Sequence, residues 1–417
     1  MLGKQDELHV KLKNARLAIE RLFLDQCQYG QQSKNLDPQW GLKTCGQFVG
    51  KEAKQSPQWG IHGTAAALRV LAVENSPEGQ EVVRELVSTL NVYWGLLPAP
   101  DGFEPRDGQS SDQNNVIKIS EVILGLLAIR PMTTDARRLA DHLAQRLLDG
   151  RIEDKGWDYF VDDTKESCAL LPTCYAVYAL SECRSAHDLN GPKGELRKHL
   201  RSFAHGQGDA AMLPTYVCTL FVLTFNAHHP SREEMKELRG FFDSLWESAR
   251  VPLRLAGTEQ NIEYDHATEI LYVRIPWQLY LLALAAKLRP YRRLGSVAAK
   301  ERLQEIIKSA ANGGFKYSQS GSRVSSRTNG ILYEVLRLID TEITSKQLWF
   351  VDVLGMLDKA RNALGSRNAQ VAYSVVAMLV GSIAVLGWLN DANHSVKDLA
   401  PDILASVMLG AAALGKK

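Results

Sequence analysis

The sequence has 417 residues, of which 45% are hydrophobic and 23% are charged, and its formal net charge is +2. This is ordinary globular composition, and the length fits two or three compact domains or one large helical domain. No Lys/Arg run stands out, so neither charge nor pattern supports binding to nucleic acid.

The cysteines and the N-terminus indicate the compartment. The six cysteines form no C-x-x-C pair, and four of them lie in or next to apolar helical patterns. They are Cys27, Cys45, Cys168, Cys174, Cys183 and Cys218. Such usage is typical of reduced, buried thiols in a cytosolic protein. The first residues are charged and amphipathic and include no apolar secretory core, so we expect a cytoplasmic globular part.

Two kinds of helix alternate between residues 8 and 340. Amphipathic helices, with apolar residues at three- and four-residue spacing, are expected at 8–24, 79–94, 134–149, 194–205, 231–249 and 296–310. Helices that are apolar on nearly all sides, and therefore buried, are expected at 63–73, 116–129, 169–180, 211–223, 268–288 and 328–339. Because no convincing alternating strands occur, we predict an all-α protein.

These helices form six pairs, each amphipathic and then apolar. The segments ALLPTCYAVYAL and AMLPTYVCTLFVL echo each other at an offset of 42 residues. An inner ring of apolar helices inside an outer amphipathic ring predicts a six-hairpin α/α toroid over residues 1–340. The alternative is an open α-solenoid. Long polar loops that carry Gly next to an aromatic residue, at 58–60, 101–103, 155–157 and 313–315, favour the closed ring.

The loops and the helices after them resemble the repeats of the terpenoid cyclase and protein prenyltransferase toroids. The segments that carry the likeness are KGWDYFVDDTKESCALLPTCYAVYAL and GGFKYSQSGSRVSSRTNGILYEVL. The resemblance covers about residues 10–340 and implies an α/α toroid. In such a repeat, Gly permits the tight turn and the aromatic residue seals the loop against the next hairpin.

The resemblance does not extend to metal ligands. A protein prenyltransferase would hold zinc with Asp, Cys and His, but Pro172 stands where the carboxylate two residues before Cys174 is required. Lanthionine cyclases are also α/α toroids and would hold zinc with Cys and His. Residues 60–63 (GIHG) are similar to one of their elements, but no Cys-His-Gly follows. We therefore expect no metal and no cofactor.

Two acidic groups remain as catalytic candidates. Asp162 and Asp163 are adjacent carboxylates, which can separate each other's pKa values and supply an acid and a base, or can simply cap the next helix from a solvated loop. With Asp158 they are spaced D-x-x-x-D-D, which is not the D-x-D-D motif of class II cyclases. Asp265 and Glu269 would share one face of a helix, although Asp265 suits a helix N-cap equally well.

Three further sets of residues each allow a functional and a structural interpretation. His62 begins an apolar helix and is either a catalytic imidazole or a capping one. Arg323 and Arg327 either bind an anion or solvate a loop. Aromatic residues on the apolar helices either line a cavity or fill the core. They include Tyr175, Tyr178, Tyr216, Tyr272, Trp277 and Tyr333.

After residue 340 the composition changes. An amphipathic linker helix is expected within 341–366, and an apolar, membrane-inserting helical hairpin at 367–417. Residues 369–389 are 21 residues without a charge, and about 20 such residues span a bilayer core. The second segment, 399–415, is shorter and contains Asp402. The alternative is a buried pair packed on the toroid.

The flanks of the hairpin suggest its orientation. Arg361 and Arg367 precede the first segment and Lys416 and Lys417 follow the second, so both ends are expected on the cytoplasmic side of an inner membrane. Small residues in both segments suit self-association. The positions expected in the membrane are Val371, Val376, Leu379, Val385, Leu386, Trp388, Leu389, Leu404, Met408 and Leu414.

Three functions follow as hypotheses. The first is a non-catalytic recognition toroid, with a protein partner, whose hairpin anchors to or perturbs a membrane. This layout resembles the membrane-targeting effectors of prokaryotic defence systems. The second is a membrane-associated terpenoid cyclase-like or prenyltransferase-like enzyme acting on an apolar substrate. The third, a carbohydrate-active toroid, would need two carboxylates facing each other across a central cleft.

Overall fold

The described part of the molecule belongs to the first of two compact units, which are Met1–Ser345 and Lys346–Lys417. The computed structural model describes residues 2–32, 42, 44–46, 48–49, 61–99, 113–153, 155–162, 168–183, 187–204, 260–264, 270–274, 307–308, 310, 314 and 324–342. The expected amphipathic linker and apolar hairpin lie outside these residues.

The described residues include eight helices and four short strands, which confirms a mostly helical fold. Four helices match expected amphipathic segments: α1 (Leu2–Gln32), α3 (Pro77–Tyr93), α6 (Thr134–Asp149) and α8 (Asn190–Ala204). Four match expected apolar segments: α2 (Ile61–Glu74), α5 (Val116–Leu127), α7 (Leu170–Glu182) and α13 (Ser326–Glu342). Burial follows the predicted spacing. Helix α6, for example, buries Ala136, Leu139, Ala140, Leu143, Ala144 and Leu147.

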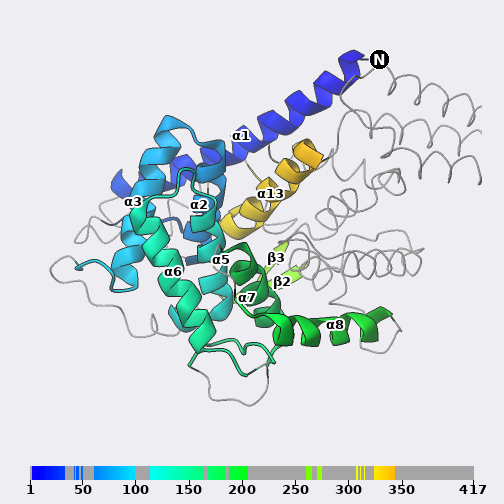
Figure 1. Cartoon of the computed structure of the whole chain (residues 1–417). Helices are drawn as coiled ribbons and strands as arrows, with labels where there is room; N and C mark the ends of the chain where they lie inside the picture. Colours follow the sequence, from blue (N-terminus) through cyan, green and yellow to red (C-terminus); the bar gives the residue numbers. More distant parts are fainter. Residues whose placement is uncertain are drawn as a thin grey trace, which may run out of the picture. The chain divides into compact units, whose positions relative to one another are not determined.

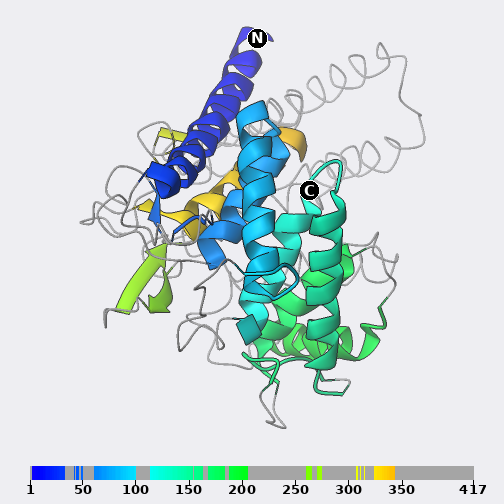
Figure 2. The same ribbon diagram turned by 90° about the vertical axis from the view of Figure 1, so that its left-hand side faces the viewer.

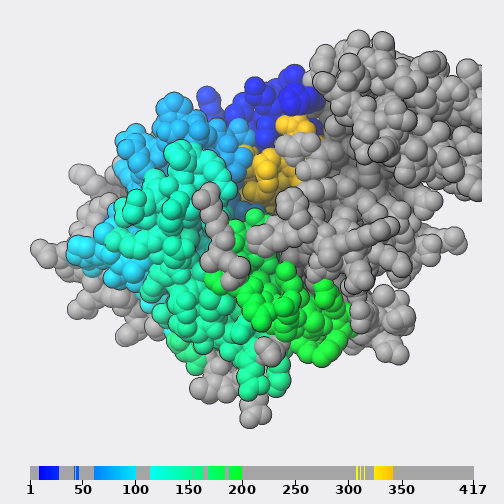
Figure 3. Space-filling view, in the orientation of Figure 1, coloured from blue at the N-terminus to red at the C-terminus, as the bar shows by residue number. Residues whose placement is uncertain are grey.

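The apolar helices pack in a row in the order α13, α2, α5 and α7 (Figure 1). Each amphipathic helix covers its neighbours in this row: α1 packs on α13 and α2, α3 on α2, α6 on α5, and α8 on α7. Figure 2 shows α3 and α6 lying against each other in front of the apolar helices. In the space-filling view, atoms of α13 adjoin those of α1 (Figure 3).

Small residues let α2 approach both of its neighbours in the row. A side chain at Gly330 of α13 would place its Cβ 2.7 Å from Cβ of Ala66. A Cβ at Gly125 of α5 would lie 3.0 Å from the carbonyl oxygen of Ala65. Glycine therefore allows close contact of α2 both with α13, which is far away in sequence, and with α5.

The loop between α6 and α7 uses glycine and tryptophan as the sequence predicts. Gly156 has a φ of +140°, and a Cβ there would lie 2.4 Å from Oγ1 of Thr173. The indole of Trp157 is fully buried and donates to the carbonyl oxygen of Leu147 at 2.6 Å. The structure thus confirms a packing role for this Gly-Trp pair. Gly314 in the later GGF segment also has a positive φ, +98°.

The loop before α2 makes the same contact as the loop before α7. Thr173 is the fourth residue of α7, and its hydroxyl bonds the backbone N–H (3.0 Å) and carbonyl (3.2 Å) of Trp157. Thr64 is the fourth residue of α2, and its hydroxyl bonds the backbone N–H (3.2 Å) and carbonyl (3.3 Å) of Cys45. Cys45 is therefore the structural equivalent of Trp157.

Each of these loops also pairs with the start of the preceding apolar helix in the row. Phe160, three residues after Trp157, forms a β-bridge with Asn115, the residue directly before α5. Phe48, three residues after Cys45, pairs with Ser325, the residue directly before α13. The latter pairing joins β1 (Phe48–Val49) to β4 (Val324–Ser325), antiparallel. The loop after α1 therefore relates to α13 as the loop after α6 relates to α5.

One predicted helix is wrong at its start. Residues expected to begin the 268–288 helix form a strand, β3 (Ile270–Arg274), which pairs antiparallel with β2 (Gln260–Tyr264). The segment ILYVR is rich in β-branched and aromatic residues, which favour a paired strand. Asp265 and Glu269, whose predicted helical spacing depended on that helix, lie outside the described residues. The expectation of no strands is corrected at this hairpin.

Candidate functional site

One polar side chain from each of the four apolar helices meets at a single place, which we name the interior cluster. It consists of His62 of α2, Glu121 of α5, Tyr175 of α7 and Arg327 of α13. His62 and Arg327 are the second residues of their helices, and Glu121 and Tyr175 are the sixth. The cluster therefore lies towards the N-terminal ends of all four helices.

Glu121 is the centre of the interior cluster. Its Oε1 accepts from Nε and Nη2 of Arg327, each at 3.0 Å, and its Oε2 accepts from Nδ1 of His62. The side chains of Glu121 and Arg327 are each 9% exposed, whereas that of His62 is 22% exposed. The carboxylate is thus held by two partners and largely removed from water.

Arg327 spans the row of apolar helices. Helix α13 packs mainly on α1 and α2, yet its Arg327 reaches both Glu121 of α5 and Tyr175 of α7. Its Nη2 donates to the Tyr175 hydroxyl at 3.1 Å, and its guanidinium carbon lies 6.0 Å from the ring centre. Four helices packed in a flat row would place the outermost axes about 25–30 Å apart, farther than these two side chains reach together. The row is therefore curved, with the cluster on its concave side.

The charges around Glu121 keep it ionised. Burial by itself would raise the pKa of this carboxyl, but the nearby charges of Arg327 and His62 outweigh burial and lower the pKa to about 2. Since an ionised carboxylate only accepts hydrogen bonds, Nδ1 of His62 is the donor in this bond, and in the neutral form of the imidazole Nε2 carries the lone pair. This arrangement orients the imidazole as a carboxylate–histidine pair does in many hydrolytic sites.

A second polar layer follows about two turns further along the same helices. Arg69 lies seven residues after His62, and Glu334 lies seven residues after Arg327. Nε of Arg69 is 3.6 Å from Oε1 of Glu334, whose other oxygen accepts from Arg337 at 3.0 Å. Burial opposes ionisation of Glu334, but Arg69 and Arg337 lower its pKa. Polar residues therefore continue along one face of the apolar helices.

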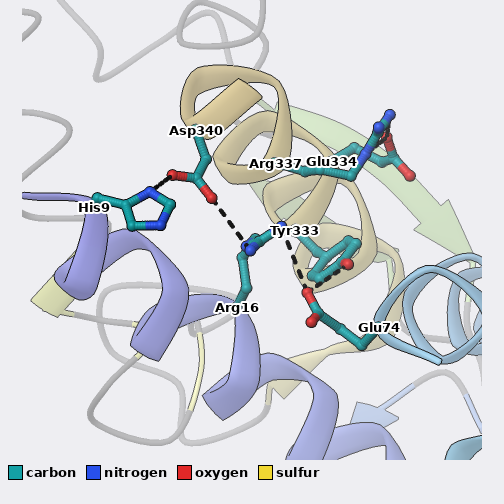
Figure 4. A network of polar contacts seen from close by, with 7 residues as sticks. All are labelled: His9, Arg16, Glu74, Tyr333, Glu334, Arg337 and Asp340. Carbon is teal, nitrogen blue, oxygen red and sulfur yellow. Dashed lines mark hydrogen bonds and ion pairs between the residues drawn. The ribbon is translucent and has the colours of Figure 1, made fainter. Parts of the chain in front are cut away.

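Helix α13 is also tied to α1 and α2 through a seam network (Figure 4). Asp340 lies 2.6 Å from Nδ1 of His9 and 3.2 Å from Nη2 of Arg16. Arg16 is 3.6 Å from Oε1 of Glu74, and the same oxygen accepts from the Tyr333 hydroxyl at 2.7 Å. Burial and this bond to Glu74 raise the pKa of Tyr333. The network joins the first helical pair to the last apolar helix.

The structure places the sequence candidates in different surroundings. His62, Tyr175 and Arg327 come together in the interior cluster, whereas Tyr333 is fully buried in the seam network. Asp162 is exposed and accepts from the Asn114 side chain. Tyr272 lies in β3, opposite Ile262 of β2. Six candidates lie outside the described residues: the carboxylates Asp163, Asp265 and Glu269, the aromatic residues Tyr216 and Trp277, and Arg323.

Sequence reasoning missed Glu121. A signal was present, because this glutamate sits in the apolar run VIKISEVILGLL, where a buried charge needs a partner.

Across the residues that the structure covers, no group of three or more His, Cys, Asp or Glu side chains is arranged to hold a metal. Nor does any of the described helices combine the length and apolar character that a membrane span needs.

No protein-family model and no curated protein matches this sequence. Arginine, an oriented imidazole, a tyrosine hydroxyl and two helix N-termini, of α2 and α13, together suit an anionic group. The same oriented imidazole also suits proton transfer.

Proposed function

We propose that residues 1–340 form a closed six-pair α/α toroid, the architecture that the repeats resemble. The support is the equivalence of the two loops. The contact that the third pair makes with the second, through Phe160 and Asn115, is made by the first pair with the last, through Phe48 and Ser325. In this arrangement the last helical pair takes the place that a pair before the first one would take. A chain arranged in this way has closed on its own start. An open solenoid leaves its first unit without such a neighbour.

The proposed function is recognition of a ligand or partner inside this ring, coupled to a membrane-acting C-terminal segment. The interior cluster carries the proposal, because it brings together helices from the first, second, third and last pairs. A buried charge pair is a weak means of stabilising a fold, since well-packed apolar residues serve as well or better. Charges at this place are therefore better explained by binding.

Covalent connection supports the coupling. Helix α13 carries Arg327 at its start and Asp340 near its end, and the second unit begins at Lys346, a few residues later. That unit contains the uncharged stretch 369–389. The whole arrangement resembles a defence-type membrane effector, in which a cytoplasmic sensor controls a membrane segment at the inner membrane.

Flotation with phospholipid vesicles tests this function. Full-length protein is expected to float with vesicles of phosphatidylethanolamine and phosphatidylglycerol. The double variant Val376→Lys/Leu379→Lys is expected to remain at the bottom, because each charge near the centre of a span costs about 3 kcal/mol. Asn14→Lys/Gln145→Lys adds the same charge at exposed positions of α1 and α6 and should float like the wild type. Full-length protein that stays unbound and monodisperse without detergent contradicts the proposal.

A second function is favoured by the His62–Glu121 pair. In this alternative the protein is a membrane-associated enzyme acting on an apolar substrate, with His62 as the base and Glu121 as its positioning residue. The variant His62→Asn distinguishes this enzyme from the recognition protein proposed above, because in the enzyme it would abolish turnover while leaving vesicle binding unchanged.

A further inference from the structure

Positive groups surround the single carboxylate of the interior cluster. Arg327 and His62 bond Glu121 directly, and Arg69, from the second layer, also acts on its charge. Arg69 is shared with Glu334, which Arg337 also holds. Within the described residues that form these contacts, three arginines and a histidine face two glutamates. Glu182, at the end of α7, acts on Tyr178 together with Arg69, Glu334 and Arg337, so a third glutamate borders the second layer.

We propose that the interior cluster is a binding site for a small ligand with a phosphate or carboxylate group, and that this group exchanges with Glu121 as the partner of Arg327. The inference rests on the proposed function and identifies the ligand's chemistry. Glu121 then competes with the ligand for Arg327. It holds Arg327 in place, and an anion displaces it only by binding Arg327 more strongly than Glu121 does.

The geometry of Arg327 favours this exchange. Nε and Nη2 of Arg327 both donate to one oxygen of Glu121, Oε1, whereas an arginine makes its strongest pairs when two nitrogens donate to two separate oxygens. A phosphate or carboxylate could accept from two guanidinium nitrogens through separate oxygens. Tyr175 supports the guanidinium through its ring and hydroxyl, so Arg327 stays in position while its partner changes.

Two other features favour an anion at this place. Helix α2 has 14 residues and α13 has 17, and His62 and Arg327 lie in their first turns, where the helix dipole stabilises negative charge. His62 is more exposed than Glu121 and Arg327, so its side marks the approach to the site.

Exchange at Arg327 would also explain the coupling to the C-terminal unit. Glu121 links α5 to α13, and the seam network fixes the other end of α13 on α1 and α2. A ligand that removes Glu121 from Arg327 changes what holds the first turn of α13 while leaving its last turn attached. The site lies at the first turn of this helix, and in the sequence the second unit begins at Lys346, four residues after the last residue of the helix.

The test is calorimetric titration of full-length protein with inorganic phosphate and, separately, with succinate, at ionic strength matched with sodium chloride. Glu121→Gln removes the competing charge and should bind the preferred anion at least about tenfold more tightly than the wild type. The double variant Glu121→Gln/Arg327→Gln leaves no buried unpaired charge and should show no saturable binding. Tighter binding of phosphate, or of succinate, by Glu121→Gln identifies which group the site takes.

Three results would overturn the inference: neither anion binds wild type or Glu121→Gln, Glu121→Gln binds no more tightly than wild type, or the double variant keeps its binding. A purely structural role for Glu121 predicts the second of these results. Because vesicle flotation does not depend on the anion, failure here leaves the membrane proposal standing, and failure of flotation leaves this one standing.

Discussion

Replacing Glu121 with leucine is expected to destabilise the protein by about 3–5 kcal/mol, because Arg327 would then be buried without its charge partner. The two side chains are each 9% exposed and lie 3.0 Å apart. The double variant Glu121→Leu/Arg327→Met should recover most of this loss, since it buries apolar side chains of similar size in place of both charges. Chemical denaturation of the single and double variants measures the difference.

Acid unfolding measures the contribution of the Glu121–Arg327 pair to stability independently of these variants. Because the folded pKa of Glu121 is lowered to about 2, its ionised form contributes stability above the ordinary glutamate pKa, and this contribution disappears as the pH falls towards 2. Its full size is about 3 kcal/mol. Glu121→Gln should lack this component of acid unfolding. If Glu121→Leu loses less than about 1 kcal/mol, the pair is not holding the helices together.

Replacing Trp157 with alanine is expected to lower the free energy of unfolding by about 3–5 kcal/mol. The indole is fully buried, and its N–H donates to Leu147, so the change leaves both a cavity and an unsatisfied carbonyl group. Trp157→Phe keeps most of the packing and should lose about 1–2 kcal/mol.

The matched control for this prediction is Tyr159→Ala, two residues further along the same loop. Tyr159 is 44% exposed, and its removal should change stability by less than about 0.5 kcal/mol. Equal losses at Trp157 and Tyr159 would show that the loop contributes as a whole and that the tryptophan does not seal it.

The alternation of helices was predictable because it depends on local periodicity. The apolar spacing of α6 is visible in its sequence, and the Gly156-Trp157 pair predicted a tight turn with a buried aromatic residue. The β2–β3 hairpin was missed, because a short apolar run such as ILYVR fits a buried helix or a strand equally well. Pairing with a partner strand decided between them.

The interior cluster was only partly predictable. His62 and Arg327 stood out as polar residues at helix starts, and each had a structural reading as well as a functional one. Glu121 was not predicted, because its partners lie on other helices, and the contact with Arg327 joins positions 206 residues apart. The seam likewise depends on pairs distant in sequence, such as Tyr333 and Glu74. Such contacts follow from the order in which helices pack, which local patterns do not contain.

Closure of the ring, with the last helical pair packed on the first, is tested most directly by an engineered disulfide. Val49 and Val324 are register partners in the β1–β4 pairing. In Val49→Cys/Val324→Cys, mild oxidation of the native protein should form a bridge that peptide mapping by mass spectrometry identifies. Val49→Cys/Gly194→Cys, with its second cysteine on α8, should form none. Absence of the 49–324 bridge, or a bridge of equal yield in the control, would contradict a closed ring.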